Sequence, residues 1–420
     1  MTMARSVLAY VFLVFSFAAT LVCAALGRMI PRRRRNKTGR ILITGRFDNR
    51  NWFISHAVPL VRSGVNEVIV VTEVEQEQMA GLRFVCPPRW AQRVFGRAIS
   101  KMAWMIVAGV KFKPDAYMGY HLFPGAMSAL IVARWFGRPA CYQMTGGPIE
   151  IAGGGFENEN ALMSSLSRSS RSLEKLALAV VRRFDLVIVR GRRAECFLAE
   201  RGLNGSVAIV TGSIAPVPGT PHGKRPVDMI FVGRMTRIKQ PEQFVRIVAA
   251  VKRDIPGVRA TMIGDGPELP ALKHTAKRLN VASNIEFTGR RDDVSAWLEQ
   301  ARVFVLVSRS EGMSIAMAEA MSHGLPAVVA DVGELGDLVK NGVNGWLVTP
   351  HDIETYARRI VELLTNESQW ARYSRSAADS ASSLMSVDRV AGRWRECLSR
   401  VIGRPPMLRA QEVTHASSEP

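Results

Sequence analysis

Residues 303–334 read VFVLVSRSEGMSIAMAEAMSHGLPAVVADVGE. The apolar, β-branched run 303–307 predicts a strand that is buried on both faces. Ser314 can cap a helix that extends through Met321. The next apolar run, residues 325–330, predicts a second buried strand. A strand, a helix and a strand in this order indicate one repeating unit of a parallel sheet.

Two glutamates flank the start of this predicted helix. Glu311 lies beside its N-terminus, where free N–H groups and the positive end of the helix dipole attract an anion. Glu319 lies further along the same helix. Two carboxylates around an anion site suit a ligand with hydroxyl groups at both ends and phosphate between them, such as a nucleotide sugar. Ordinary surface glutamates are the alternative interpretation.

The same alternation of strands and helices continues through the chain in two halves. Strands are predicted at 40–45, 67–72, 115–120, 139–144 and 185–189, and again from residue 229 onward. A segment rich in proline and glycine separates the halves. The predicted divisions are a transmembrane anchor (6–27), a first domain (38–215), a linker (216–226), a second domain (227–385), a C-terminal helix (386–403) and a disordered tail (404–420). The predicted fold class is α/β, with two doubly wound Rossmann-like domains facing a cleft.

Composition and charge narrow the class of protein. The chain has 420 residues, 47% of them hydrophobic, which is enough for two or three domains with buried cores. Its five cysteines form no Cys-x-x-Cys pair, which argues against a disulfide framework or a zinc site and favours a reducing compartment. The formal charge of +20 suggests an anionic partner, which could be nucleic acid, acidic lipid or a phosphorylated substrate.

The amino terminus predicts a membrane anchor. No charged residue interrupts 6–27, and seven arginines and lysines follow between Arg28 and Arg40 without an acid. By the positive-inside rule, a single-pass helix would place everything after it in the cytoplasm, at the inner membrane. A cleaved signal peptide is the alternative, but the arginine block after the apolar run resists translocation. No second apolar stretch of this length follows Arg40.

Polar and glycine residues stand directly after the predicted strands of the second half, where parallel strands present their carboxyl ends to ligands. They are Gly233, Arg234 and Lys239 after the first strand, Asp265 and Gly266 after the second, and Arg290 after the third. Arg234 can bind phosphate oxygens with its forked guanidinium group, and Lys239 adds a compact charge. Each base alone is typical of the surface of a basic protein, but their common edge favours an anion site.

Five segments of the second half occur in a recognisable order. They are FVGRMTRIKQPEQF, MIGDGPEL, IEFTGRRDDV, SRSEGMSIAMAEAMSHGLPAVVADVGE and LVKNGVNGWLVTPHD, within residues 228–352. Together they resemble the successive motifs of retaining glycosyltransferases of family 4, which have the GT-B fold. The first half agrees with that family in the layout of its strands and helices. The resemblance implies an enzyme that uses a nucleotide-diphosphate sugar as donor.

The resemblance also implies roles for individual residues. Arg234 and Lys239 would bind the donor diphosphate, Glu311 would lie near the donor sugar, and Glu319 would bind the ribose hydroxyls. The implied donor-binding set is Gly233, Arg234, Lys239, Asp265, Gly266, Arg290, Glu311, Gly312, Met313, Ser314, Ile315 and Glu319, and the implied catalytic set is Glu311, His121, Arg234 and Lys239.

The first half offers fewer functional candidates. His121 follows a predicted strand, as the active-site histidine of the family does, and a structural histidine is the alternative. The first loop, residues 44–48, has a single glycine, and Arg46 stands where the family commonly has a small residue. The glycine-rich segment 145–160 either borders the acceptor or is a flexible loop.

We expect neither a cofactor nor a metal ion. The chain has no Asp-x-Asp sequence, and Arg234, Lys239 and the helix N-terminus can stabilise a departing nucleoside diphosphate. The resemblance implies retention of anomeric configuration without a dedicated nucleophile. The expected acceptor is lipid-linked or a glycolipid, as in assembly of a cell-surface polysaccharide, and no nucleic acid partner is expected.

Two other classes of protein fit parts of the sequence. A Rossmann dehydrogenase or epimerase would use a glycine fingerprint, but the nearest one, residues 264–269, ends in leucine and contains Pro267. A non-catalytic, membrane-anchored protein could bind lipid or nucleic acid through its basic surface. That protein would have no need of Glu311 and Glu319.

Overall fold

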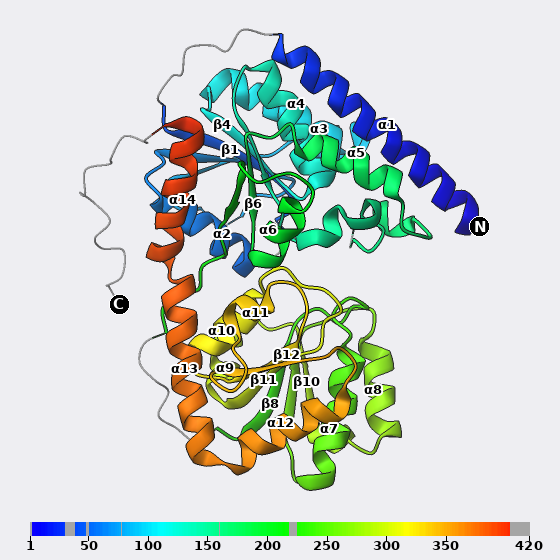
Figure 1. Ribbon diagram of the computed structural model, residues 1–420, viewed down its shortest axis with the longest axis vertical. Helices are drawn as coiled ribbons and strands as arrows, with labels where there is room; N and C mark the ends of the chain where they lie inside the picture. Colours follow the sequence, from blue (N-terminus) through cyan, green and yellow to red (C-terminus); the bar gives the residue numbers. More distant parts are fainter. Residues whose placement is uncertain are drawn as a thin grey trace. The chain divides into compact units, whose positions relative to one another are not determined.

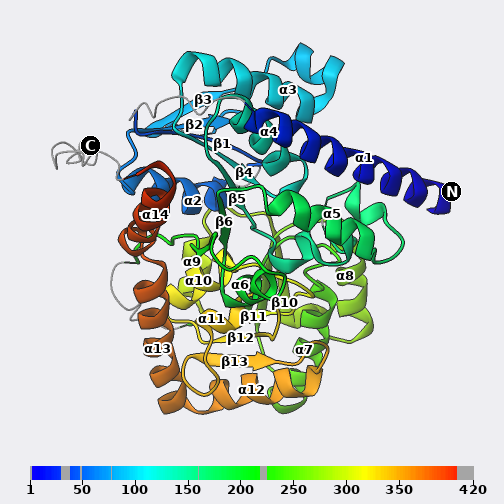
Figure 2. The same ribbon diagram turned by 45° about the horizontal axis from the view of Figure 1, so that its top comes forward.

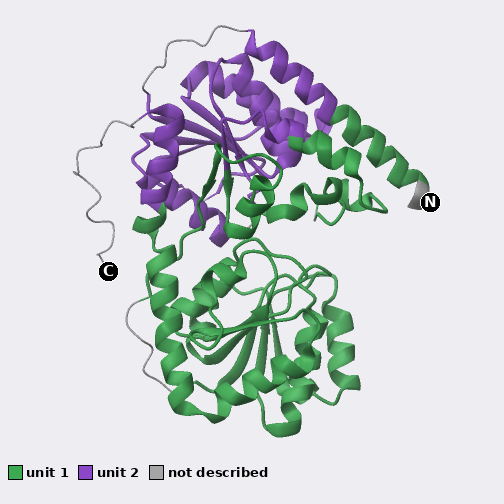
Figure 3. Ribbon diagram, in the orientation of Figure 1, with its two compact units in different colours: residues 1–16, 144–178, 188–390 green, residues 17–143, 179–187, 391–420 purple. Residues whose placement is uncertain are grey.

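The computed structural model describes residues 2–29, 38–47, 50–76, 78–158, 160–217 and 225–403. It divides into two compact units (Figure 3). Unit 1 comprises residues 1–16, 144–178 and 188–390, and unit 2 comprises residues 17–143, 179–187 and 391–420. The predicted tail 404–420 and most of the predicted linker 216–226 lie outside the described residues. The predicted domain boundaries therefore stay predictions.

The first sheet has seven strands in the order β3-β2-β1-β4-β5-β6-β7 (Figure 1). Its strands are β1 Arg40–Thr44, β2 Glu67–Val71, β3 Leu82–Val85, β4 Ala116–Tyr120, β5 Ala140–Gln143, β6 Leu186–Val189 and β7 Val207–Ile209. Neighbours from β3 to β5 pair in parallel. The connecting helices are α2 Arg50–Arg62, α3 Arg89–Phe112, α4 Met127–Trp135, α5 Arg171–Val181 and α6 Arg192–Ala199. The sequence analysis missed β3 and β7, which are short strands at the two edges.

The second sheet has six parallel strands in the order β10-β9-β8-β11-β12-β13. Its strands are β8 Val227–Val232, β9 Ala260–Ile263, β10 Ile285–Gly289, β11 Ala301–Leu306, β12 Ala327–Ala330 and β13 Gly345–Val348. Its helices are α7 Pro241–Asp254, α8 Leu269–Arg278, α9 Val294–Glu299, α10 Ile315–Ser322, α11 Leu335–Leu338 and α12 Ile353–Thr365, and α13 Glu367–Met385 and α14 Val387–Ile402 end the described chain. Both sheets are doubly wound, as the sequence predicted.

Residues 303–334 form the centre of the second sheet. β11 carries Phe304 and Val305 with no exposed surface, because helices cover both faces of the sheet. α10 follows β11 and buries Met317 and Met321 in the same core. Ser314 caps α10 by accepting a hydrogen bond from the Met317 N–H at 3.3 Å. The predicted strand, capped helix and strand are confirmed.

The amino terminus forms one long helix, α1 Thr2–Arg28. Among the described residues it is the one helix long and apolar enough to cross a membrane, a test that a signal sequence also passes. One side of α1 is buried, with Leu13 and Phe17 fully enclosed. The other side is apolar and exposed, as at Leu8 and Phe15.

Candidate functional site

The second sheet has its topological switch point between β8 and β11. From β8 the chain builds the sheet outward through β9 and β10, and then returns to place β11 on the other side of β8. In doubly wound sheets, ligands bind outside the carboxyl ends of the two strands at such a point. The loops that leave β8 and β11 there are joined by a hydrogen bond of 2.8 Å from the Arg309 N–H to the Ile238 carbonyl.

These two loops bring Lys239 and Glu311 together. The Lys239 ammonium nitrogen lies 2.6 Å from Oε1 of Glu311. The Glu311 side chain is 7% exposed and that of Lys239 is 20% exposed, so the ion pair lies mostly out of water. The sequence predicted both residues for one site, and the structure shows that they are direct partners. The pair places a cation and a carboxylate at the switch point, next to the start of α10.

The backbone packs closely around Glu311. A Cβ atom on Gly312 would lie 2.2 Å from the Thr145 carbonyl oxygen. A Cβ atom on Gly333, whose φ is +53°, would lie 1.8 Å from the Glu311 carbonyl oxygen. Only glycine fits at either position, because another backbone segment occupies the space of the side chain. Glu311 is therefore held by contacts on both sides of its peptide.

Glu319 lies within α10 and is half-buried. Burial raises the pKa of its carboxyl group from 4.5 to about 7. Within the described part of the chain, its carboxylate has no hydrogen bond or ion pair to offset the loss of water. A buried carboxylate of this kind is a ready acceptor for the hydroxyl groups of a ligand.

The remaining donor-side candidates lie on the neighbouring loops. Arg234 is exposed directly after Gly233, at the carboxyl end of β8. Arg290 is exposed after β10, and its guanidinium group makes no hydrogen bond or ion pair to another described residue. Met313 and Ile315 flank the Ser314 cap and are partly exposed. No contact that the structure shows tests the predicted roles of these residues.

The glycine-rich loop after β9 has a structural explanation. A Cβ atom on Gly264 would lie 1.9 Å from the Gly233 carbonyl oxygen, and one on Gly266 would lie 2.4 Å from the Met235 carbonyl oxygen. The Asp265 carboxylate accepts a hydrogen bond from the Gly266 N–H at 2.7 Å. These glycines let the loops after β8 and β9 approach each other, so they need no dinucleotide to account for them. A donor contact by Asp265 and Gly266 stays a prediction.

His121 lies in unit 2, at the carboxyl end of β4. β1 and β4 flank the switch point of the first sheet, so His121 occupies the ligand-binding edge of that sheet. Its φ of +58° is unusual for a residue with a side chain. Its N–H donates to the Gln143 carbonyl at 3.1 Å, and its carbonyl accepts from the Ala126 N–H at 2.9 Å. The backbone is thus firmly held, which suits either a catalytic or a structural histidine.

The sequence analysis missed Lys101 of α3. Its buried ammonium group lies 2.9 Å from the Gly45 carbonyl oxygen and 2.9 Å from Oε1 of Glu73. The lysine thereby holds the loop after β1, where Arg46 is exposed. No sequence motif marks Lys101, because its partners are 28 or more positions away.

The predicted segment 145–160 forms short 3-10 turns, η2 Gly147–Glu150 and η3 Ala152–Gly154. The buried Glu150 carboxylate accepts a hydrogen bond of 2.6 Å from the Gly146 N–H. Glu157 forms an ion pair with Arg309 of the loop after β11. With the Thr145 contact to Gly312, these interactions place the segment beside the Glu311 turn. An acceptor-binding role stays a prediction.

Glu334 is buried, and its side chain lies against the first residues of α6. Its two carboxylate oxygens accept hydrogen bonds from the N–H groups of Arg193 and Ala194 at 2.9 and 2.8 Å. Asp337 accepts from the Arg192 N–H at 2.8 Å. Burial raises the pKa of Glu334, and the two N–H donors partly oppose this shift. The pair stabilises the helix N-terminus.

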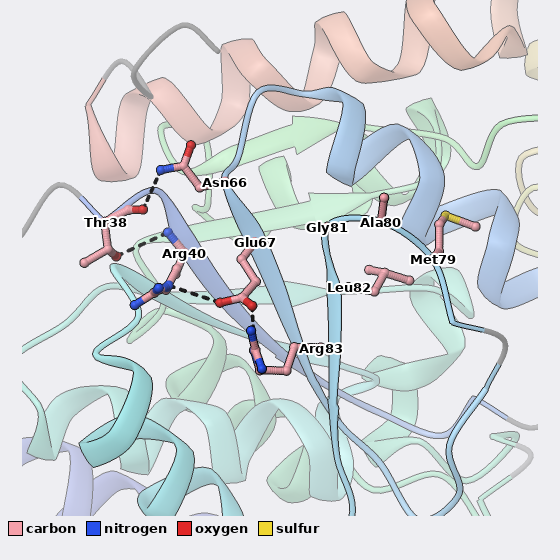
Figure 4. A pocket seen from close by; sticks show the side chains of 9 residues that line it. All are labelled: Thr38, Arg40, Asn66, Glu67, Met79, Ala80, Gly81, Leu82 and Arg83. Carbon is pink, nitrogen blue, oxygen red and sulfur yellow. Dashed lines mark hydrogen bonds and ion pairs between the residues drawn. The ribbon is translucent and has the colours of Figure 1, made fainter. Parts of the chain in front are cut away.

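A separate pocket of about 430 Å³ lies in unit 2, at the amino ends of β1, β2 and β3 (Figure 4). Glu67 lies between two arginines there, with Nε of Arg40 at 3.1 Å and Nε of Arg83 at 2.5 Å. No predicted site residue lines this pocket, and it lies at the opposite end of the strands from His121. Among the described residues, no group of three or more His, Cys, Asp or Glu side chains could hold a metal ion.

Comparison with known proteins shows which type of domain the second half of the chain resembles. Residues 226–366 match the family described as Glycosyl transferases group 1. The chain is 34% identical over 173 residues to D-inositol 3-phosphate glycosyltransferase of Mycobacterium marinum, which covers 39% of this chain and 36% of that protein. It is 25% identical over 229 residues to an exopolysaccharide phosphotransferase of Streptomyces coelicolor, covering 52% and 24%. The matched regions span about a third of the length of the first of these relatives and about a quarter of the length of the second.

The fold as a whole is similar to solved structures. HepE of Anabaena, in complex with UDP-glucose, superposes with a TM-score of 0.68 at 16% identity, covering 86% of this chain and 99% of that one. The similarity to HepE shows that the chain has the GT-B fold, and residues 226–366 are similar to a glycosyltransferase group 1 domain. The predicted α/β fold is confirmed.

Proposed function

We propose that this protein is a retaining glycosyltransferase of family 4, which transfers a sugar from a nucleotide-diphosphate sugar to an acceptor hydroxyl group. The observation that carries the proposal is the meeting of Lys239 and Glu311 at the switch point of the second sheet, beside the start of α10. The group 1 domain match covers this region, and the similar structure of HepE holds UDP-glucose. Nucleotide sugars are thus the class of donor that we expect.

The leaving diphosphate would be stabilised by cations and by backbone N–H groups. Lys239 and Arg234 follow β8, and the start of α10 presents free N–H groups beside Glu311. In the structure, Glu311 neutralises Lys239. A bound phosphate would compete for the same ammonium group and release Glu311 toward the sugar. This exchange keeps the charge of the lysine compensated in both states.

Glu319 would bind the ribose. Its carboxylate is half-buried and has no partner among the described residues, so two neighbouring hydroxyl groups would replace the water that it has lost. Binding would favour the ionised form and bring the raised pKa down again. Met313 and Gly312 lie on the turn before α10, where the donor sugar would sit.

We expect the reaction to need no metal ion and no cofactor, because side-chain cations can take the part of a metal at the diphosphate. Same-face departure and attack would give retention, so the site would need no separate nucleophile. His121 of unit 2 is the candidate for the acceptor side of the reaction.

For the acceptor, we propose a lipid-linked substrate or a glycolipid at the cytoplasmic face of the inner membrane. The support is the apolar helix α1, with the arginine-rich sequence that follows it. Fusions after Pro420 test the orientation. A fluorescent protein that folds in the cytoplasm should be bright, and a phosphatase that is active in the periplasm should be silent. An active phosphatase would refute this topology.

A nucleotide screen tests the proposed transferase activity. Thermal unfolding of the purified protein should shift upward with one of UDP, GDP or ADP and with its sugar conjugate, because a ligand of the native state raises the unfolding temperature. The control is Arg278→Ala on the exposed face of α8, which should bind the same nucleotide as the wild type. If no nucleotide stabilises the wild-type protein, the proposed donor site is wrong.

A further inference from the structure

The outer face of α3 has the wrong polarity for a helix in water. A surface helix normally turns polar residues to the solvent. In α3, large apolar side chains point outward with 54% to 69% of their surface exposed; they are Trp90, Val94, Phe95, Ile99, Val107 and Val110. Surfaces of this kind usually contact another molecule.

These exposed apolar residues, which we call the α3 face, lie on two helical segments. Ile99, Val107 and Val110 follow the spacing i, i+8 and i+11, which places them on one side of an α-helix. Trp90 and Val94 are four residues apart on the segment before Gly96. Gly96 has a φ of +76° and bends the helix between the two segments.

The opposite side of α3 fixes the helix to unit 2. Ser100, Met105 and Ala108 are buried, and Lys101 reaches Gly45 and Glu73 through the contacts described above. The α3 face is therefore not needed to hold the helix on the sheet. Its apolar character requires another explanation.

Positive charge borders the α3 face. Besides Lys101, which is buried on the opposite side, residues 89–112 contain four arginines and lysines and no acidic residue. Arg89, Arg93 and Arg97 are exposed, and within the described part of the chain their guanidinium groups make no ion pair. Cations that alternate with tryptophan, phenylalanine and aliphatic side chains are typical of helices that lie in the interface of an anionic membrane.

The α3 face is also connected to the apolar helix α1 through α4. α3 packs against α4, and the C-terminal end of α1 packs against α4 so closely that a Cβ atom on Gly27 would lie 2.6 Å from Cβ of Arg134. Figures 1 and 2 both show α4 beside this part of α1 and beside α3. Trp135, at the end of α4, is 47% exposed.

We propose that the α3 face binds an anionic lipid leaflet, as a second membrane contact beside α1. The apolar side chains enter the interface, and Arg89, Arg93 and Arg97 bind lipid phosphates. This contact would hold unit 2 against the leaflet. It does not depend on the proposed glycosyl transfer.

Photo-crosslinking of the full chain in vesicles tests the proposal without removing α1. A photoreactive benzoylphenylalanine replaces Val94, and a control protein carries it at His274 on the exposed face of α8, where no exposed large hydrophobic residue lies. In vesicles of phosphatidylcholine and phosphatidylglycerol, the probe at position 94 should form lipid adducts and the probe at position 274 should not. Equal yields at the two positions would overturn the proposal.

The charge dependence tests the role of the arginines. Substitution of Arg89, Arg93 and Arg97 by glutamate should lower the adduct yield at position 94 in these vesicles, by at least about fivefold, which is the gain expected from one base near an anionic leaflet. The matched control reverses Lys273, Lys277 and Arg278 of α8, and it should leave the yield unchanged. An unchanged adduct yield in the α3 variant would refute the proposed binding of lipid phosphates by the three arginines.

Two further measurements separate the alternatives. Nucleotide-induced thermal stabilisation should be the same in the α3 variant and the wild type, so loss of lipid contact can be told apart from loss of folding or of the donor site. In native membranes, the probe at position 94 should label lipid. A protein adduct in place of the lipid adduct would mean that the α3 face binds a protein partner instead.

Discussion

Glu319→Gln is expected to stabilise the ligand-free protein at pH 8 and to weaken its binding of the nucleotide. The carboxyl group of Glu319 is half-buried without a partner among the described residues, and burial raises its pKa from 4.5 to about 7. An amide of the same shape has no charge to desolvate. The substitution therefore removes an unfavourable charge from the free protein and a hydroxyl acceptor from the complex.

The size of the effect follows from proton linkage. Between pH 4.5 and about 7, the folded protein holds a proton on Glu319 that the unfolded chain has lost. The free energy of unfolding therefore falls as the pH rises through this window, and it stays lower above it. At about 1.4 kcal/mol per pKa unit, the upper limit is about 3 kcal/mol. Because the side chain is partly exposed to solvent, we expect on the order of 1–2 kcal/mol.

Thermal unfolding of detergent-solubilised protein at pH 5 and pH 8 measures this effect. Wild type and Glu319→Gln should unfold at similar temperatures at pH 5, and the variant should unfold a few degrees higher at pH 8. The control is Glu286→Gln, at an exposed position of β10, which should show no such difference. A difference between wild type and Glu319→Gln that is the same at both pH values would refute the reasoning.

The pH dependence of nucleotide binding gives an independent test of the role of the Glu319 carboxylate. The affinity of the wild type for its nucleotide sugar should rise between pH 6 and pH 8, because the ionised carboxylate is the form that accepts hydroxyl donors. The diphosphate of a nucleotide sugar is already ionised throughout this range. In Glu319→Gln the affinity should be lower and independent of pH. A wild-type affinity that does not change with pH would contradict the assignment of Glu319 to the ribose.

Three further predictions concern the same region. Lys239→Ala should lower the unfolding temperature, because it removes the charged partner of Glu311. It should also weaken nucleotide binding by about 1.5–3 kcal/mol, because it removes a charged partner of the phosphate. Titration calorimetry measures the affinity for the nucleotide, and an unchanged affinity would exclude Lys239 from the site. Gly312→Ala should destabilise the protein by about 1–3 kcal/mol, because its Cβ atom would lie 2.2 Å from the Thr145 carbonyl oxygen, whereas Gly257→Ala, with nothing within 4 Å, should be neutral or slightly stabilising. Transfer should persist after exhaustive EDTA treatment, and activity that is lost and then restored by magnesium or manganese would show that the donor diphosphate needs a metal ion.

Local sequence was sufficient to predict the repeating units of the second half. The apolar run of β11, the Ser314 cap and the helix α10 were found because strand periodicity and helix capping depend on neighbouring residues. The order of strand ends also placed Arg234, Lys239 and Glu311 at one edge of a parallel sheet. Strands β3 and β7 escaped notice because short edge strands have little periodicity to detect.

Contacts between distant segments were decided by the tertiary structure alone. Lys239 and Glu311 are 72 positions apart, and their pairing exists because the chain returns to place β11 beside β8. The raised pKa of Glu319 depends on burial, which is a property of everything packed around α10. Only the packing of α3 on the first sheet determined which of its apolar side chains remain exposed. Periodicity and capping are local, whereas burial and ion pairing depend on residues that the fold brings together from far along the chain.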